Sequence, residues 1–185
     1  MAIETEKKYR IDKKMLVELA VRIVEMGGVF AYESFEENYL HRGGVLDARG
    51  AVLRLRKTKE ETVLTYKEKV GSQADFKQQI EHETVVADVD ATEAIIERLG
   101  YTLACVYEKH RKAWHLGNTE VVLDELPFGF YMEIEGSIED ILATEKLLGI
   151  EHLETESRGY PRLTTKSGRL VGNVFEARFE KTQSA

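Results

Sequence analysis

Cysteine is nearly absent from this 185-residue sequence, in which Cys105 is the single example. One cysteine excludes an internal disulfide bond and a cysteine-based zinc site. Ala104 and Val106 flank Cys105 in an apolar stretch, so we expect its side chain to be packed and not to act as a nucleophile. The scarcity of cysteine favours a cytoplasmic location.

Long apolar runs are also missing. Charged residues begin at Glu4, and no apolar segment precedes them, so the sequence predicts no secretory signal peptide. No later run approaches the length of a transmembrane helix. We therefore expect no membrane partner.

An excess of positive charge is the third missing feature. The formal net charge is −7 and the pI is about 5.4, so we expect no nucleic-acid partner. The glycine pairs at 27–28 and 43–44 lack the lysine and serine of a phosphate-binding loop and are predicted to be turns. The histidines show no zinc-protease spacing and are predicted to be structural or exposed; they are His41, His82, His110, His115 and His152.

The composition that remains is typical of an ordered protein, with 43% hydrophobic and 32% charged residues, and the length suits one domain. Helices are predicted to begin at Asp12, Asp90 and Ser137, with a helical turn near Tyr160. Loops are predicted at 43–50 and 71–75. Strands are predicted at 3–11, 29–41, 51–57, 62–69, 78–86, 101–115, 120–126 and 130–136.

Charged residues recur at a spacing of two within these strands. In a strand this spacing places side chains on one face. The rows are Glu4, Glu6 and Lys8; Arg54 and Arg56; Lys67 and Lys69; Glu81 and Glu83; Lys109 and Arg111; and Glu133 and Glu135, with Asp124 near the end of its own strand.

Alternating charge most often marks a solvent-exposed sheet face. Here the opposite faces are apolar, as Leu53 and Leu55 beside Arg54 illustrate, so helices can cover them and leave the charges on the inner wall of a curled sheet. Most rows also carry one sign of charge, whereas a soluble surface usually mixes signs. Such a wall requires compensation. Carboxylates suit Mg²⁺ or Mn²⁺ and basic side chains suit phosphate oxygens, so the pattern predicts a site for a polyphosphate with its metals.

The ordered rows resemble the CYTH superfamily, the triphosphate tunnel metalloenzymes, which include class IV adenylyl cyclases, thiamine triphosphatases and inorganic triphosphatases. Glu4-x-Glu6-x-Lys8 is similar to the family signature, and the other rows follow in the family's order. The resemblance implies an α+β fold: a closed antiparallel eight-stranded β-barrel, or tunnel, with helices packed outside. It implies a domain at 1–166 and leaves 167–185 as a C-terminal extension of unknown role.

The resemblance also implies roles for individual residues. The metal ligands would be Glu4, Glu6, Asp124, Glu133 and Glu135. The phosphate-binding residues would be Lys8, Arg54, Arg56, Lys67, Lys109 and Arg111. Glu81 and Glu83 would support the basic residues, and Lys69 would be structural or peripheral. Tyr39 would pair with Lys8 to activate water, and the turn from Tyr160 to Leu163 with Lys166 would form a lid.

The function implied is a phosphohydrolase that acts on a small-molecule triphosphate with Mg²⁺ or Mn²⁺. The substrate stays open among inorganic tripolyphosphate, thiamine triphosphate and a nucleoside triphosphate. One alternative is a class IV-type adenylyl cyclase that converts ATP to cyclic AMP and pyrophosphate, although the His-Phe pair that often precedes the signature in bacterial cyclases is missing here. Another is a noncatalytic polyphosphate- or nucleotide-binding module. The sequence leaves a homodimer open.

Overall fold

A computed structural model of the protein describes residues 3–73 and 75–180. The strands within this part of the chain are β1 (Ile3–Ile11), β2 (Val29–Arg42), β3 (Ala51–Lys57), β4 (Thr62–Gln73), β5 (Phe76–Val85), β6 (Thr102–Leu116), β7 (Thr119–Leu126), β8 (Gly129–Glu135), β9 (Arg169–Val171) and β10 (Val174–Ala177). The helices are α1 (Lys13–Glu25), α2 (Gly44–Arg49), α3 (Val89–Arg98), α4 (Ile138–Leu148) and α5 (Tyr160–Ser167).

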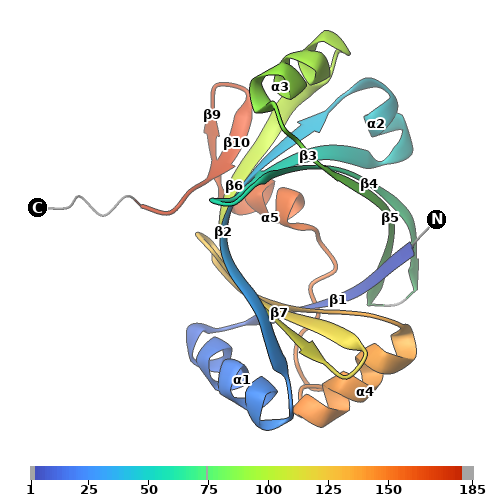
Figure 1. Cartoon of the computed structure of the whole chain (residues 1–185), viewed down its shortest axis with the longest axis vertical. Helices are drawn as coiled ribbons and strands as arrows, with labels where there is room; N and C mark the ends of the chain where they lie inside the picture. The colour runs from blue at the N-terminus through green and yellow to red at the C-terminus, as the bar shows by residue number, and fades with distance from the viewer. Residues whose placement is uncertain (1–2, 74, 181–185) are drawn as a thin grey trace, which may run out of the picture.

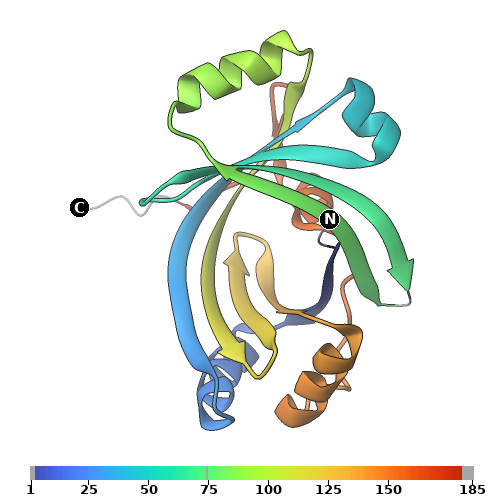
Figure 2. The ribbon, with the colours of Figure 1, turned by 45° about the vertical axis from the view of Figure 1, so that its right-hand side comes forward.

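Strands β1 to β8 form a closed ring. They pair in the order β2-β3-β4-β5-β1-β8-β7-β6, and β2 returns to pair with β6. Every neighbouring pair in the ring is antiparallel. Helices α1 and α4 lie outside one part of the ring, and α2 and α3 lie outside the opposite part (Figures 1 and 2). The predicted closed eight-stranded sheet with outer helices is therefore confirmed.

The larger hydrophobic core lies between the outer face of the ring and helices α1 and α4. Leu19 and Ile23 of α1 are buried against Met132 and Ile134 of β8, together with Ile141 of α4. Because side chains alternate along a strand, the same strand that buries Met132 and Ile134 outward must turn its other residues inward. The outer core thus determines which side chains face the interior of the ring.

Three local predictions were wrong. The segment at 43–50 contains the short helix α2, which buries Leu46 and ends at Gly50 in a left-handed conformation with φ of 65°. Helix α3 begins after Asp88 and not at Asp90, because the Asp88 carboxylate accepts the backbone N–H of Ala91 at 2.9 Å. Strand β4 continues to Gln73, inside the loop predicted at 71–75; residue 74 of that loop lies outside the described residues.

The C-terminal extension contains a small hairpin. Strand β9 pairs antiparallel with β10, and β10 pairs parallel with β6 between Cys105 and Tyr107. This hairpin and α5 lie side by side near β6 (Figure 1). The part of the extension at 181–185 lies outside the described residues. Among the described helices, none combines the length and apolarity needed to cross a membrane.

A buried ion pair joins β1 to α4 on the outer side of the ring. The carboxylate of Glu145 accepts hydrogen bonds from Lys7 Nζ at 2.6 Å and from Tyr9 Oη at 2.7 Å. We predict that Glu145→Ala lowers the free energy of unfolding by about 3–5 kcal/mol, because it leaves the ammonium group of Lys7 buried without its partner. Denaturant unfolding followed by circular dichroism measures this loss.

The control is the double variant Lys7→Met with Glu145→Leu, which removes both charges and keeps the volume apolar. Its stability should be clearly higher than that of Glu145→Ala and should fall below that of the unaltered protein only by the cost of leaving the Tyr9 hydroxyl without its acceptor, about 1–3 kcal/mol. A Glu145→Ala protein as stable as the double variant would contradict the prediction.

Candidate active site

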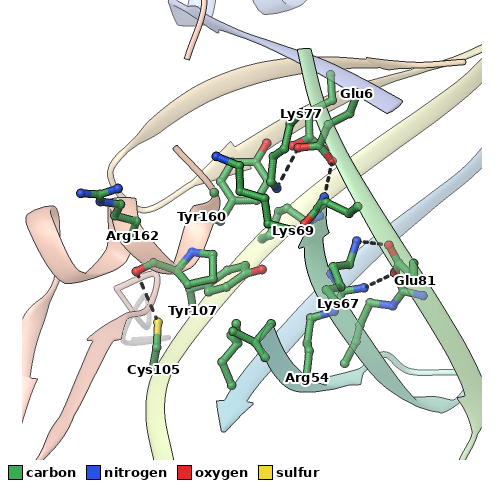
Figure 3. A pocket seen from close by; sticks show the side chains of 18 of the residues that line it. Glu6, Arg54, Lys67, Lys69, Lys77, Glu81, Cys105, Tyr107, Tyr160 and Arg162 are labelled. Carbon is green, nitrogen blue, oxygen red and sulfur yellow. Dashed lines mark hydrogen bonds and ion pairs between the residues drawn. The ribbon is translucent and has the colours of Figure 1, made fainter. Parts of the chain in front are cut away.

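A cavity of about 900 Å³ runs through the ring. Twelve of the fourteen predicted site residues line it: Glu4, Glu6, Lys8, Arg54, Arg56, Lys67, Glu81, Glu83, Lys109, Arg111, Glu133 and Glu135. Lys69, predicted to be peripheral, lines it as well. The structure therefore brings the charged rows together, as Figure 3 shows for Glu6, Lys67 and Glu81. The two exceptions are Asp124 and Tyr39.

One wall is basic and only loosely neutralised. Arg54 Nη2 lies 3.3 Å from Thr65 Oγ1, 3.5 Å from Glu81 Oε1 and 3.3 Å from Glu83 Oε1. Arg56 approaches the same carboxylate of Glu83 at 3.5 Å, and Lys67 forms an ion pair with Glu81. The arginine contacts are longer than those of good charge-assisted hydrogen bonds. Guanidinium groups held this loosely can exchange their partners for an incoming anion.

Another wall is acidic and poorly neutralised. Antiparallel pairing places Glu135 of β8 directly opposite Glu6 of β1 on one side and Glu120 of β7 on the other. Burial and the neighbouring carboxylate of Glu120 raise the pKa of Glu135 to about 7. Burial and the nearby Glu81 raise the pKa of Glu4 to about 8. Burial is the larger cause of both shifts and the neighbouring carboxylates add to it, whereas the nearby Lys67 opposes them without cancelling them.

Between these walls the charges are tightly paired. Arg111 donates to both oxygens of Asp124, at 2.8 and 2.6 Å, and to Glu133 Oε2 at 2.6 Å. Lys8 Nζ lies 3.1 Å from Glu133 Oε1. Although burial opposes it, the positive charges of Lys8 and Arg111 hold the pKa of Glu133 well below its ordinary value. Lys109 is buried beside Glu36, with Nζ 3.2 Å from Glu36 Oε2.

Asp124 was predicted as a metal ligand, but the structure buries it behind the cavity wall. It is fully buried and does not line the cavity. Its oxygens accept hydrogen bonds from Arg111 and from Tyr160 Oη, the latter at 2.7 Å. In this arrangement Asp124 holds Arg111 and Tyr160, both of which line the cavity, and does not line it itself.

The structure does not bring Tyr39 to Lys8. Asn38 and Leu40 of β2 turn inward, and Leu40 lines the cavity. Tyr39 lies on the outer face, where Lys57 Nζ is 4.5 Å from its ring centroid and its hydroxyl donates to Glu37 at 3.2 Å. The predicted pairing was wrong because the alternating sequence did not reveal which face of β2 turns inward.

The tyrosine beside Lys8 is Tyr160, at the start of α5. Lys8 Nζ lies 4.0 Å from the centroid of its ring, and Lys109 Nζ lies 5.4 Å from it. Figure 3 shows Tyr160 directed into the site. The sequence had indicated this segment as a lid, and the structure places its first residue among the charged side chains.

Sequence reasoning missed three charged residues that lie beside the predicted charged rows. Lys77 lines the cavity and contacts Glu6 Oε1 at 3.1 Å. Glu120 lines it beside Glu135, and Glu36 pairs with Lys109. Lys77 and Glu120 each precede a predicted site residue by four positions in the same strand, so the period of two could have found them. No comparable signal distinguished Glu36 from the exposed charges of β2.

The acidic wall offers suitable chemistry for a divalent cation. Its donors are carboxylate oxygens, the ligands that Mg²⁺ and Mn²⁺ prefer. Among the described residues, no group of three or more metal-ligating side chains is already arranged around one point. Glu6, Glu135 and Glu120 nevertheless lie opposite one another on three neighbouring strands, and a cation would offset their combined negative charge.

The sequence and the fold both match known proteins. A family model described as the CYTH domain matches residues 2–167. The chain belongs to the CYTH family. This confirms the resemblance noted in the sequence. Proteins with CYTH domains are typically triphosphatases or related to adenylyl cyclases, and they generally use divalent metals. No curated protein sequence matches the chain.

Several solved structures share the CYTH tunnel fold. A conserved hypothetical protein from Pyrococcus furiosus has a TM-score of 0.74 and 22% identity, and the match covers 86% of this chain and 99% of that one. A candidate adenylate cyclase from Vibrio parahaemolyticus has a TM-score of 0.67 and 22% identity, and the match covers 88% of this chain and 98% of that one. A candidate adenylyl cyclase from Hippeastrum is described as having a dominant triphosphatase activity. Its TM-score is 0.66 and its identity 15%, and the match covers 92% of this chain and 98% of that one. At these identities the likeness shows the fold alone.

The contrast between Tyr160 and Tyr39 leads to a prediction. Tyr160→Phe removes a hydrogen bond to a fully buried carboxylate, so it should lower the free energy of unfolding by about 1.5–3 kcal/mol. It should also slow the turnover of any triphosphate, because Asp124, which pairs with Arg111, loses the hydroxyl that helps to fix its position, while the ring beside Lys8 is kept. The measurements are denaturant unfolding and phosphate release.

The matched control is Tyr39→Phe, which removes a hydroxyl on the outer face of the ring. Its turnover should equal that of the unaltered protein. A loss of turnover confined to Tyr39→Phe would show that the placement of the two tyrosines is wrong.

Proposed function

We propose that the protein is a divalent-metal-dependent phosphohydrolase acting on a small-molecule triphosphate. The observation that supports this is one cavity with a loosely paired basic wall and an under-neutralised acidic wall. A polyphosphate with its cation complements both walls at once. A nucleic-acid partner fits less well, because the basic residues of the site lie inside the ring and the chain has a net charge of −7.

The basic residues would bind the phosphate oxygens. Arg54 and Arg56 are poised to exchange their long carboxylate contacts for shorter bidentate ones. Arg111 is already held by two carboxylates, so its guanidinium keeps a fixed orientation at the edge of the site. Fixed donors stabilise developing charge without reorganisation.

The carboxylates Glu4, Glu6 and Glu135 would hold the cation, with Glu120 beside them. The cation, when bound, would offset the negative charge of the phosphate oxygens during displacement. Asp124 and Glu133 would act by holding Arg111 and Lys8 in place.

Two lysines differ in how readily they release a proton. Burial lowers the pKa of Lys8, but Glu133 and Glu6 outweigh it and raise that pKa overall. Lys8 therefore stays charged and suits phosphate binding. Burial outweighs the effect of Glu6 at Lys77 and lowers the pKa of its amino group.

Phosphate release from tripolyphosphate, thiamine triphosphate and ATP, with Mg²⁺ or Mn²⁺, tests the proposal. We expect turnover of at least one of them that requires the metal and stops with a chelator. Glu135→Gln should reduce metal-dependent turnover by at least about tenfold. Absence of turnover for all three substrates would refute the proposal.

The control for this variant is Glu125→Gln on the neighbouring strand β7. Side chains alternate along β7, and Asp124 turns toward the interior charges, so Glu125 faces the other way. Its removal should leave turnover unchanged. Chromatography of the ATP products separates hydrolysis from cyclisation, because cyclic AMP with pyrophosphate would indicate a cyclase instead.

A further inference from the structure

The cavity is chemically divided along its length. The part described above carries the charged rows, whereas the part near α5 and β10 is lined mainly by uncharged side chains. We name this part the neutral chamber and define it by Leu40, Val52, Ala104, Cys105, Pro161 and Phe175. Every carboxylate among the described lining residues belongs to β1, β5, β7 or β8. The chamber is built by β2, β3, β6, α5 and β10, so it receives none of them.

The C-terminal hairpin supplies one wall of the neutral chamber. Strand β10 pairs with β6 so that Phe175 lies opposite Cys105. Phe175 and Asn173 both line the cavity, although both lie beyond the residues that match the CYTH domain. The shared family region therefore builds the charged part, and the extension completes the uncharged part.

The charged groups near the neutral chamber are cationic. Arg42 and Arg162 also line this part of the cavity. The guanidinium of Arg42 donates to Asp47 at 2.7 Å, whereas none of the ion pairs found among the described residues includes Arg162. Burial raises the pKa of the Cys105 thiol to about 11, so the thiol stays neutral at physiological pH. These features disfavour a positively charged ring and suit a neutral one.

Helix α5 spans both parts of the cavity. Its first residue, Tyr160, contacts Lys8 and Lys109. Its next residue, Pro161, lines the neutral chamber, and its carbonyl oxygen lies 3.9 Å from Cys105 Sγ. Figure 3 shows Tyr160 and Tyr107 between the charged side chains and Cys105. A linear molecule with one polyanionic end and one flat uncharged end would match this order of side chains.

We infer that the neutral chamber binds the base of a nucleoside triphosphate, with the ring of Phe175 as a stacking surface, and that the C-terminal hairpin makes this protein prefer such a substrate to inorganic tripolyphosphate. A cavity of about 900 Å³ lies near the upper end of the range, about 300–1,000 Å³, in which ligands of this size bind. The inference rests on the proposed function for the phosphate end of the cavity.

Steady-state kinetics with ATP, thiamine triphosphate and tripolyphosphate test the inference. The expected kcat/KM is highest for ATP, because thiamine carries a positively charged ring and tripolyphosphate has no ring. Phe175→Ala should raise the KM for ATP roughly tenfold, since stacking on an aromatic side chain contributes about that factor or more. The KM for tripolyphosphate should not change.

Two further variants keep the test decisive. Phe175→Leu retains apolar volume, so it should preserve the fold of the hairpin. It should still raise the KM for ATP, because it removes the aromatic ring. Val171→Ala alters the same hairpin at an exposed residue outside the cavity lining. It should change the KM neither for ATP nor for tripolyphosphate. Equal losses for ATP and tripolyphosphate in Phe175→Leu would overturn the inference, because the hairpin would then only support the ring.

The remaining outcomes separate this inference from the proposed function. Efficient hydrolysis of tripolyphosphate in preference to ATP would overturn the inference and leave the triphosphatase proposal intact. Where no substrate is turned over, calorimetric titration with ATP and with tripolyphosphate decides: tighter binding of ATP that Phe175→Leu weakens supports the chamber. Equal binding of both would overturn it.

Discussion

The ion pairs of Arg111 with Asp124 and Glu133 join three neighbouring strands inside the ring. Arg111 belongs to β6, Asp124 to β7 and Glu133 to β8, and each carboxylate lies within 2.6 Å of the guanidinium. Taking these ions out of water costs several kcal/mol each, so they persist only because the partners meet with good geometry. That geometry depends on the antiparallel register of three strands and on an outer core that turns their other faces toward α1 and α4.

Neutralisation is uneven along the cavity, and this unevenness is what gives the interior its chemistry. Arg111 is satisfied by short contacts, but Arg54 has only long ones, and Glu135 faces two other carboxylates. A fully paired interior would be stable and inert toward ions. In this interior, basic side chains without close partners and carboxylates without close partners lie in separate places. Such an interior favours a ligand that carries both signs of charge, such as an anion with its cation.

The period of two in the sequence was sufficient to predict the ring's strands and most of its inner wall. It specifies which residues share a face, but the choice between the two faces is made by tertiary packing. For β3 and β8 the residues that alternate with the charged rows are apolar, so the choice was clear. In β2 aromatic and apolar side chains occupy both faces, as Tyr39 and Leu40 show. The placement of Tyr39 was therefore wrong, and Glu36 was missed.

Contacts between distant segments could not be predicted from the sequence, for a different reason. Tyr160 meets Lys8 across 152 positions, the difference between their residue numbers, because α5 returns to the interior of the ring. The role of Asp124 likewise depends on where Tyr160 Oη lies. Neither segment carries a local pattern that specifies the other. The ordered charged motifs established the family, whereas the pairing of individual side chains required coordinates.

The position of β10 has a consequence for the chain outside catalysis. Strand β6 is longer than β7, which pairs with it only from His110 onward. The backbone from Cys105 to Tyr107 would otherwise present unpaired amide and carbonyl groups at the seam of the ring, and β10 occupies them. Unpaired strand edges recruit strands from other molecules. The hairpin therefore covers this edge of β6 and leaves the three-residue strand β9 at the end of the sheet, so a version shortened after α5 would expose the longer edge of β6 even with every charged row intact.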